Sequence, residues 1–143
     1  MAALVQDALA EVIAEEIADT GVASCVGYPA GGPTDEQVWT EGGFELAFIR
    51  RTSGDTSRTE VAALAVKVLI TRAADEVAEL RDRALVLVSH IEDAVRDHET
   101  LTGLVERLWV EGTKASEGVL EDGRRQFGAT VTVRYEVTVT RSA

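Results

Sequence analysis

The last stretch of the chain, Phe127 to Arg141, has the most regular pattern of hydrophobic and polar positions. Every second position is apolar, namely Phe127, Ala129, Val131, Val133, Tyr135, Val137 and Val139. Strict alternation predicts one β-strand over 127–141, with an apolar face and a polar face. At about 3.3 Å per residue this strand would be about 50 Å long, against about 17–20 Å for an ordinary strand. We therefore expect the strand either to bend or to pair at its end with something outside its own domain.

Two other segments repeat their apolar residues at steps of three and four. Such a repeat places the apolar side chains on one side of a helix. The first segment predicts an N-terminal helix within residues 1–20, and the second predicts a main helix over residues 74–98. Their apolar stripes are Leu4, Val5, Ala8, Leu9, Val12, Ile13 and Ile17 in the first, and Val77, Leu80, Ala84, Leu87, Ile91 and Ala94 in the second, widened by Leu85, Val88 and Val95.

Shorter alternating runs predict further strands around these helices. Residues 44–51, 64–72 and 104–110 are predicted strands, and 22–28 is a strand or an extended connection. Glycine, proline and polar residues predict loops at 29–40 and 111–125 and an exposed turn at 52–60. The pattern indicates one α+β domain spanning 1–143. Its expected architecture is a mostly antiparallel sheet packed against one long amphipathic helix plus an N-terminal helix.

Composition narrows the classes of function. The chain has 143 residues, a formal net charge of −11 and a pI of about 4.6. Recognition of free nucleic acid and avid binding to an anionic membrane both need basic surface, so the charge disfavours both. No stretch has the pattern of a signal peptide or a membrane-spanning helix, and Cys25 is the only cysteine. These features predict folding in a cytoplasm.

A search for catalytic chemistry finds no set of residues with the required spacing. His90 and His98 are eight residues apart, and neither the HExxH nor the CxxC pattern of metal sites occurs. Cys25 lies in an apolar run without a neighbouring base, which is typical of an inert buried thiol. The sequence therefore predicts no catalytic residue, no cofactor and no metal.

Two tryptophans and three arginines are candidates for contacts with a partner protein. Trp39 and Trp109 are either aromatic anchors for a partner or covers of the sheet edge. Arg50, Arg51 and Arg58 flank the turn predicted at 52–60 and form a basic spot on an acidic protein. An ordinary solvated hairpin tip would have the same composition.

The order of elements resembles the tail-terminator (tail-completion) proteins of long-tailed bacteriophages. Three parts carry the resemblance, over about residues 38 to 141. They are the strand, Gly-Asp turn and strand of 44–72, the helix exit HETLTGLV at 98–105, and the strand TVTVRYEV at 130–137. Thr100 departs from the family, where an Asp-Pro-like turn is expected before the leucine.

The resemblance implies a structural protein of the virion, without catalytic residues or cofactor. Subunits of this family form a hexameric ring that caps the tail tube and joins it to the head-side connector protein. The chain would then act at the head–tail junction after assembly in the host cytoplasm, and an acidic lumen would repel DNA. Residues proposed for such contacts are Arg50, Arg51, Asp55, Arg58, Trp109, Arg134 and Glu136. The alternatives are a head-completion, neck or minor tail protein, or more distantly a small cytoplasmic ligand-binding domain or enzyme.

Overall fold

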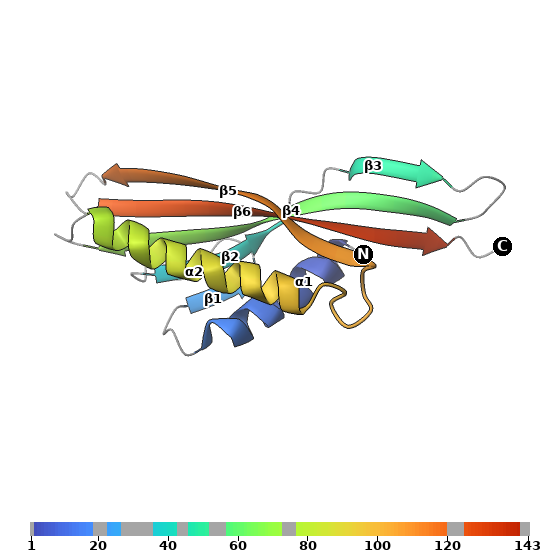
Figure 1. Ribbon diagram of the computed structural model, residues 1–143, viewed down its shortest axis with the longest axis horizontal. Helices are drawn as coiled ribbons and strands as arrows, with labels where there is room; N and C mark the ends of the chain where they lie inside the picture. The colour runs from blue at the N-terminus through green and yellow to red at the C-terminus, as the bar shows by residue number, and fades with distance from the viewer. Residues whose placement is uncertain are drawn as a thin grey trace.

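The computed structural model describes residues 2–18, 23–26, 36–42, 46–51, 57–72, 77–119 and 125–140. These residues form two helices and six strands (Figure 1). The elements in chain order are α1 (Ala2–Glu16), β1 (Ala23–Val26), β2 (Glu36–Glu41), β3 (Leu46–Arg51), β4 (Ser57–Arg72), α2 (Val77–Asp97), β5 (Arg107–Val119) and β6 (Arg125–Thr140). Neither helix is long and apolar enough to cross a membrane among the residues so described.

All six strands belong to one sheet, and the predicted α+β fold is confirmed. The strand order is β1-β2-β4-β6-β5, and β3 also pairs with β4. The β1–β2 pair is parallel and the other pairs are antiparallel. Because β6 occupies one edge of β4, both β2 and β3 lie along the other edge, one after the other. The two longest strands therefore form the centre of the sheet.

The length of β6 is explained within the chain itself. Strands β4 and β6 have 16 residues each and pair over their whole length, from Ser57 opposite Thr140 to Arg72 opposite Arg125. We expected the long strand to bend or to pair outside the domain. Pairing with β4 along the whole strand accounts for the length of β6 on one edge. Pairing of its end outside the domain stays a prediction for the other edge, which β5 covers only as far as Glu136.

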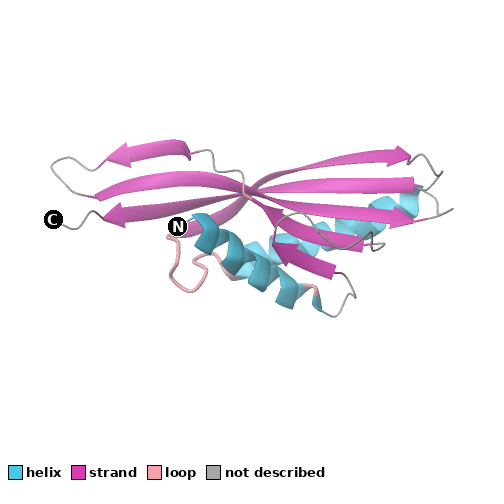
Figure 2. Ribbon diagram, turned by 180° about the vertical axis from the view of Figure 1, so that it is seen from behind, coloured by secondary structure: helices cyan, strands magenta, loops and turns pink. Residues whose placement is uncertain are grey.

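Both helices lie on one face of the sheet, called here the inner face, and the opposite face is called the outer face (Figures 1 and 2). The apolar parity of β6 points to the inner face as the alternation predicted, and Val131 and Val133 are fully buried there. Helix α2 buries the predicted stripe against the sheet, including Val88 and Val95. Leu85 is an exception, since 48% of it is exposed. The rest of the core comprises Val5, Leu9, Ile13, Ile17, Val38, Leu64, Val66, Val68, Ile70, Leu80, Leu87 and Ile91.

At one end the sheet extends beyond the helices. Figures 1 and 2 show β3, the first half of β4 and the last part of β6 continuing past the helical layer, and these strands are called here the arm. Strand β5 begins at Arg107, opposite Glu136, and Glu106 N donates to Glu136 O at 2.8 Å. Beyond Glu136, β6 has β4 on one side and no described strand on the other.

The loop after α2 closes the core near the base of the arm. Leu101, Thr102 and Gly103 have φ values of 47°, 57° and 90°, the left-handed region that only glycine adopts without cost. Leu101 is nevertheless 2% exposed, and Val105 N donates to Thr100 O at 3.1 Å. Burial of Leu101 and this hydrogen bond hold the strained turn. It occupies the position where the sequence departs from the phage family.

The predicted strand over 104–110 begins later in the structure, because residues 104–106 lie in the turn after α2 and β5 starts at Arg107. Three segments predicted as loop or turn belong to strands instead. Residues 36–40 were predicted as loop and belong to β2, whose backbone pairs with β1 and β4 on its two sides. Residues 111–119 were also predicted as loop and belong to β5, although all side chains from 111 to 118 are exposed. Residues 57–60 extend β4 into the predicted turn, whose other residues, 52–56, lie outside the described part of the chain. In these three segments the hydrophobic and polar positions do not alternate clearly, and backbone pairing with a neighbouring strand determines the strand conformation.

Tyr135 gives the fold a dependence on alkaline pH. It is 4% exposed, and burial, followed by the nearby Glu60 carboxylate, raises the pKa of its hydroxyl above the usual 10.0. When the pKa of a group is higher in the folded state than in the unfolded state, the group stabilises the fold fully at a pH below its pKa in the unfolded state. This contribution to the free energy of unfolding is lost as the pH rises through the pKa in the folded state. We expect the urea midpoint to fall above pH 10 and Tyr135→Phe to reduce that fall. An identical pH profile for both proteins would contradict this assignment.

Candidate assembly surfaces

The outer face of the sheet brings together three of the predicted contact residues. Trp109 on β5 lies directly opposite Arg134 on β6, and Arg107 lies opposite Glu136. All four have the parity opposite to that of the buried Leu108, Val133 and Tyr135, so they belong to the outer face. The polar face of the last strand is therefore part of a surface on the side of the sheet away from both helices.

These outer-face side chains are fixed by contacts with one another. The Arg107 guanidinium lies 4.4 Å from the centre of the Trp109 ring, within the range of a cation–π contact. Arg134 Nε lies 2.7 Å from Glu111 Oε2. Arg107 and Glu111 were not identified from the sequence. Their contacts with Trp109 and Arg134 depend on the register of β5 with β6, which no local sequence pattern indicates. The result is a pre-arranged aromatic and charged surface, which is the kind of site that partner proteins contact.

The other predicted contact residues are associated with the arm. Arg51 lies opposite Arg58 and Arg50 opposite Thr59 in the β3–β4 pair. The structure thus places the backbones of Arg50, Arg51 and Arg58 side by side in the arm, with β3 on the opposite side of β4 from β6. Their side chains, and the whole of Asp55, lie outside the described part of the chain. Their role in partner contacts stays a prediction.

A shallow pocket of about 390 Å³ lies on the outer face, between β2, β4, β6 and β5. Its side-chain lining includes Trp39, Lys67, Leu69, Lys114, Ser116 and Thr130, and it is called here the outer-face pocket. Lys67 Nζ donates to Thr130 Oγ1 at 3.0 Å. No carboxylate or imidazole is among the described residues that line it, so this pocket suits an apolar or anionic group rather than acid–base chemistry.

The pocket residues had little signal in the sequence. Lys114 and Ser116 fall in the segment predicted as loop, and Trp39 falls in the other mispredicted loop. Trp39 is only 6% exposed and donates from Nε1 to Glu41 Oε1 at 2.9 Å. Trp39 therefore covers the sheet, and it also lines the outer-face pocket, so its role as an anchor for a partner stays a prediction. Trp109, by contrast, is partly exposed beside Arg107.

The exposed surface of the helical layer is more acidic than the outer face. Helix α1 contains no lysine or arginine, and its exposed side carries Asp7, Glu11 and Glu15 at steps of four. Like charges at this spacing destabilise an isolated helix by about 0.2–0.5 kcal/mol per pair. The outer-face pocket, in contrast, has Lys67 and Lys114 in its lining. The lining of the outer-face pocket is therefore locally basic, whereas the exposed side of α1 is acidic.

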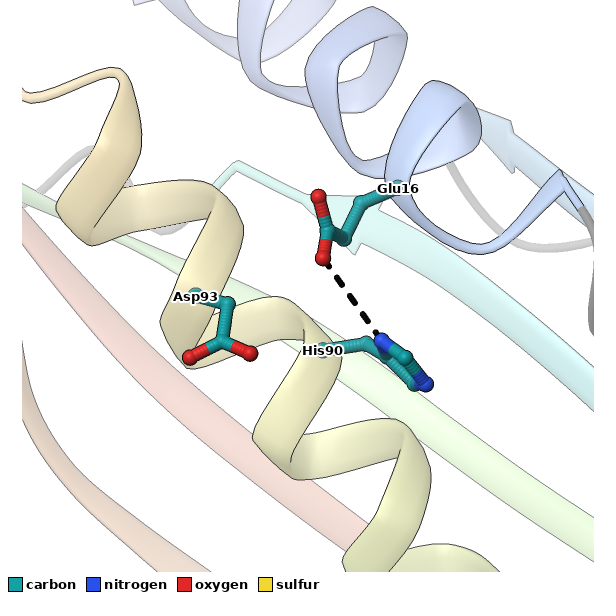
Figure 3. Close-up of side chains that lie close together, drawn as sticks. All are labelled: Glu16, His90 and Asp93. Atoms are coloured by element: carbon teal, nitrogen blue, oxygen red, sulfur yellow. Dashed lines mark ion pairs between the residues drawn. The ribbon is translucent and has the colours of Figure 1, made fainter.

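One cluster of possible metal ligands joins the two helices. Glu16, His90 and Asp93 each have one ligand atom within 4.8 Å of the others (Figure 3). The dashed line in Figure 3 joins Glu16 Oε1 on α1 to His90 Nδ1 on α2, 3.6 Å apart. Asp93 is engaged by Arg96 at 2.7 Å, and all three ligand side chains are partly exposed. A cation would have to displace Arg96, so we interpret the cluster as a contact between helices, worth at most about 1 kcal/mol at such exposure.

Comparison with known proteins gives one informative similarity. No protein-family model matches the sequence, and no curated protein matches it. Among solved structures, a chain from the virion of a native gene transfer agent particle is similar, with a TM-score of 0.52 and 18% sequence identity. The similarity covers 92% of this chain and 93% of that chain. At this identity the similarity establishes a shared fold over nearly the whole length of both chains.

Proposed function

We propose that this chain is a structural protein of a phage-like virion, with the role of a tail terminator. Its subunits form a ring, six by analogy with that family, which caps the tail tube and joins it to the head-side connector. The observation that carries the proposal is the match along nearly the full length of a virion chain. The order of elements that resembles tail terminators supports it independently, because that resemblance rests on sequence features alone.

The surfaces of the molecule agree with a role in assembly. A substrate site would need a concave pocket with convergent catalytic groups. In the outer-face pocket, Lys67, Thr130 and Ser116 supply an ammonium group and hydroxyls, and no carboxylate or imidazole is among the described residues of its lining. The arm places strand edges beyond the helical layer, where a neighbouring subunit can reach them (Figure 2). We therefore propose a non-enzymatic role at the head–tail junction of the particle, without a cofactor.

The partners distinguish this role from those of related virion proteins. We expect this chain, co-expressed with the tail tube protein and the head-side connector protein of its particle, to co-purify with both. Co-purification with portal-side proteins alone would instead assign it to the neck or to head completion. A stabilising shift with a metabolite, together with a strictly monomeric state, would favour the ligand-binding or enzyme alternative.

A further inference from the structure

Helix α2 exposes two adjacent aliphatic side chains on its solvent side. Leu85 is 48% exposed and Val86 is 46% exposed, whereas the apolar stripe on the other side of α2 is buried. Asp82, whose side chain is 70% exposed, precedes them by three and four residues and so lies one turn away on the same surface. The Leu85–Val86 pair is therefore an exposed apolar patch with a carboxylate beside it. Asp82 Oδ1 also lies 3.3 Å from Arg81 Nη2, so this carboxylate is shared with a cation of its own helix.

The outer-face pocket lies behind this pair, on the other side of the molecule. Arg83 of α2 contacts Glu36 of β2 through two hydrogen bonds of 2.6 and 3.2 Å. Glu36 lies opposite Ile70 of β4, one residue from Leu69 of the pocket lining. The Leu85–Val86 pair and the outer-face pocket are therefore at about the same position along the sheet, on opposite surfaces.

The chemistry of the two features is complementary. The pocket offers the apolar surfaces of Trp39 and Leu69 together with the ammonium groups of Lys67 and Lys114. The helical side offers two aliphatic side chains, with Asp82 one turn away and the acidic row of α1 on the same layer. A surface of this kind, pressed against the outer face, would place aliphatic groups against the pocket and carboxylates against lysines.

We propose that the outer-face pocket receives the Leu85–Val86 pair of a second copy of this chain. The inference deepens the proposed function, on which it rests, by assigning the surfaces through which ring subunits meet. Because the two surfaces differ and lie back to back, the contact is heterologous, and each copy keeps one free surface for the next. A rotation between successive copies then closes the ring.

The Leu85–Val86 pair would act as the anchor of a larger contact. A stable interface buries about 1,200–2,000 Å² in total, far more than two side chains supply. The rest of the buried area would come from the helical layer of one copy, packed against the outer face around the pocket of the next copy. In such interfaces a few central side chains account for most of the affinity. Substitutions in the pair should therefore have large effects compared with other exposed positions.

Cross-linking tests the pairing of surfaces directly. In a Cys25→Ser background, a Val86→Cys variant and a Ser116→Cys variant would be mixed and oxidised. We expect covalent dimers that contain one copy of each variant. Thr113→Cys is the matched control, because it is exposed on the same strand with the opposite parity, and it should give no dimers with Val86→Cys. Dimers formed only between two Val86→Cys copies would overturn the proposal.

Substitutions test the energetic role of the pair. Leu85→Asp should raise the protein concentration needed for assembly at least tenfold, as measured by sedimentation velocity. Leu4→Asp is the control, since Leu4 is 57% exposed on α1 and lies outside the pair. Lys114→Glu should also weaken assembly, and adding Asp82→Lys should restore at least part of it. Circular dichroism and a urea midpoint confirm that each variant is folded.

The outcomes separate the two proposals. Rings of the wild-type protein that tolerate Leu85→Asp as well as Leu4→Asp would overturn this interface and leave the proposed function standing. A wild-type protein that stays monomeric at high concentration would overturn both. Loss of rings with Leu85→Asp alone, together with Val86–Ser116 cross-links, is the result that we expect.

Discussion

Replacing Val133 with aspartate is expected to cost the fold a large part of its stability. Val133 is fully buried beneath the helical layer, and its neighbours in the ladder are Leu64 on β4 and Val110 on β5. A carboxylate there has no cationic partner, and an uncompensated buried charge costs about 3–5 kcal/mol. Because a domain has about 5–15 kcal/mol of stability in total, this loss ranges from about a fifth of the stability to all of it.

The control for this experiment is the adjacent residue. Thr132 belongs to the outer face, opposite Ala65 and Gly112, and is partly exposed. Thr132→Asp should cost no more than about 1 kcal/mol, the span of strand propensities. Urea denaturation followed by circular dichroism measures both variants. Equal losses of stability would contradict the assignment of inner and outer faces.

The second large effect concerns the arm, and we expect proline to act differently at two adjacent positions. Glu136 O accepts a hydrogen bond from Glu106, so the backbone groups of Glu136 point towards the β5 side. Alternate residues of an antiparallel strand point to opposite sides. The N–H of Val137 therefore points to β4, where Glu60 is its partner, and the N–H of Thr138 points to the edge beyond β5.

Val137→Pro should therefore damage the fold of the arm. It removes an internal hydrogen bond from the β4–β6 ladder, which costs about 1–3 kcal/mol when a buried partner is left unsatisfied. Thr138→Pro removes no ladder bond within the described chain, and proline is tolerated at such edges. It removes only the exposed hydrogen bond from the Thr138 hydroxyl to the Glu106 carboxylate. We expect Thr138→Pro to keep a urea midpoint close to that of the wild type but to weaken assembly at least tenfold, if the arm edge contacts a neighbouring subunit as we propose. A folded Thr138→Pro variant with wild-type assembly would contradict the role of the arm.

The sequence predicted the elements whose stability comes from side-chain burial. The alternation in β6 and the three-and-four repeat in α2 both reflect which side chains face the core, so they are visible without the structure. The full pairing of β4 with β6 was not predicted. The residues that lengthen β4, from Ser57 to Val61, are polar or only half-buried, so the pattern of the core does not extend to them.

The surface sites were harder to predict than the core. Arg134 and Glu136 were predicted on one polar face of the last strand, because the parity of a strand is a local property. That Trp109 of β5 shares this face depends on the register of β5 with β6 and was not predicted. The pocket depends on register between four strands, and one of these, β5, is exposed at every position from 111 to 118. Its pairing with β6 is a long-range property of the backbone. No local pattern could have brought Lys114 next to Lys67.

Electron microscopy of the purified protein tests the central claim most directly. The account predicts closed rings with six-fold symmetry, and a mass in light scattering of about six times the 15.3 kDa of one chain. The Leu85→Asp variant should appear as small particles at the same concentration, and the Leu4→Asp variant as rings. Featureless particles of monomer mass for the wild-type protein, at high concentration, would contradict the account.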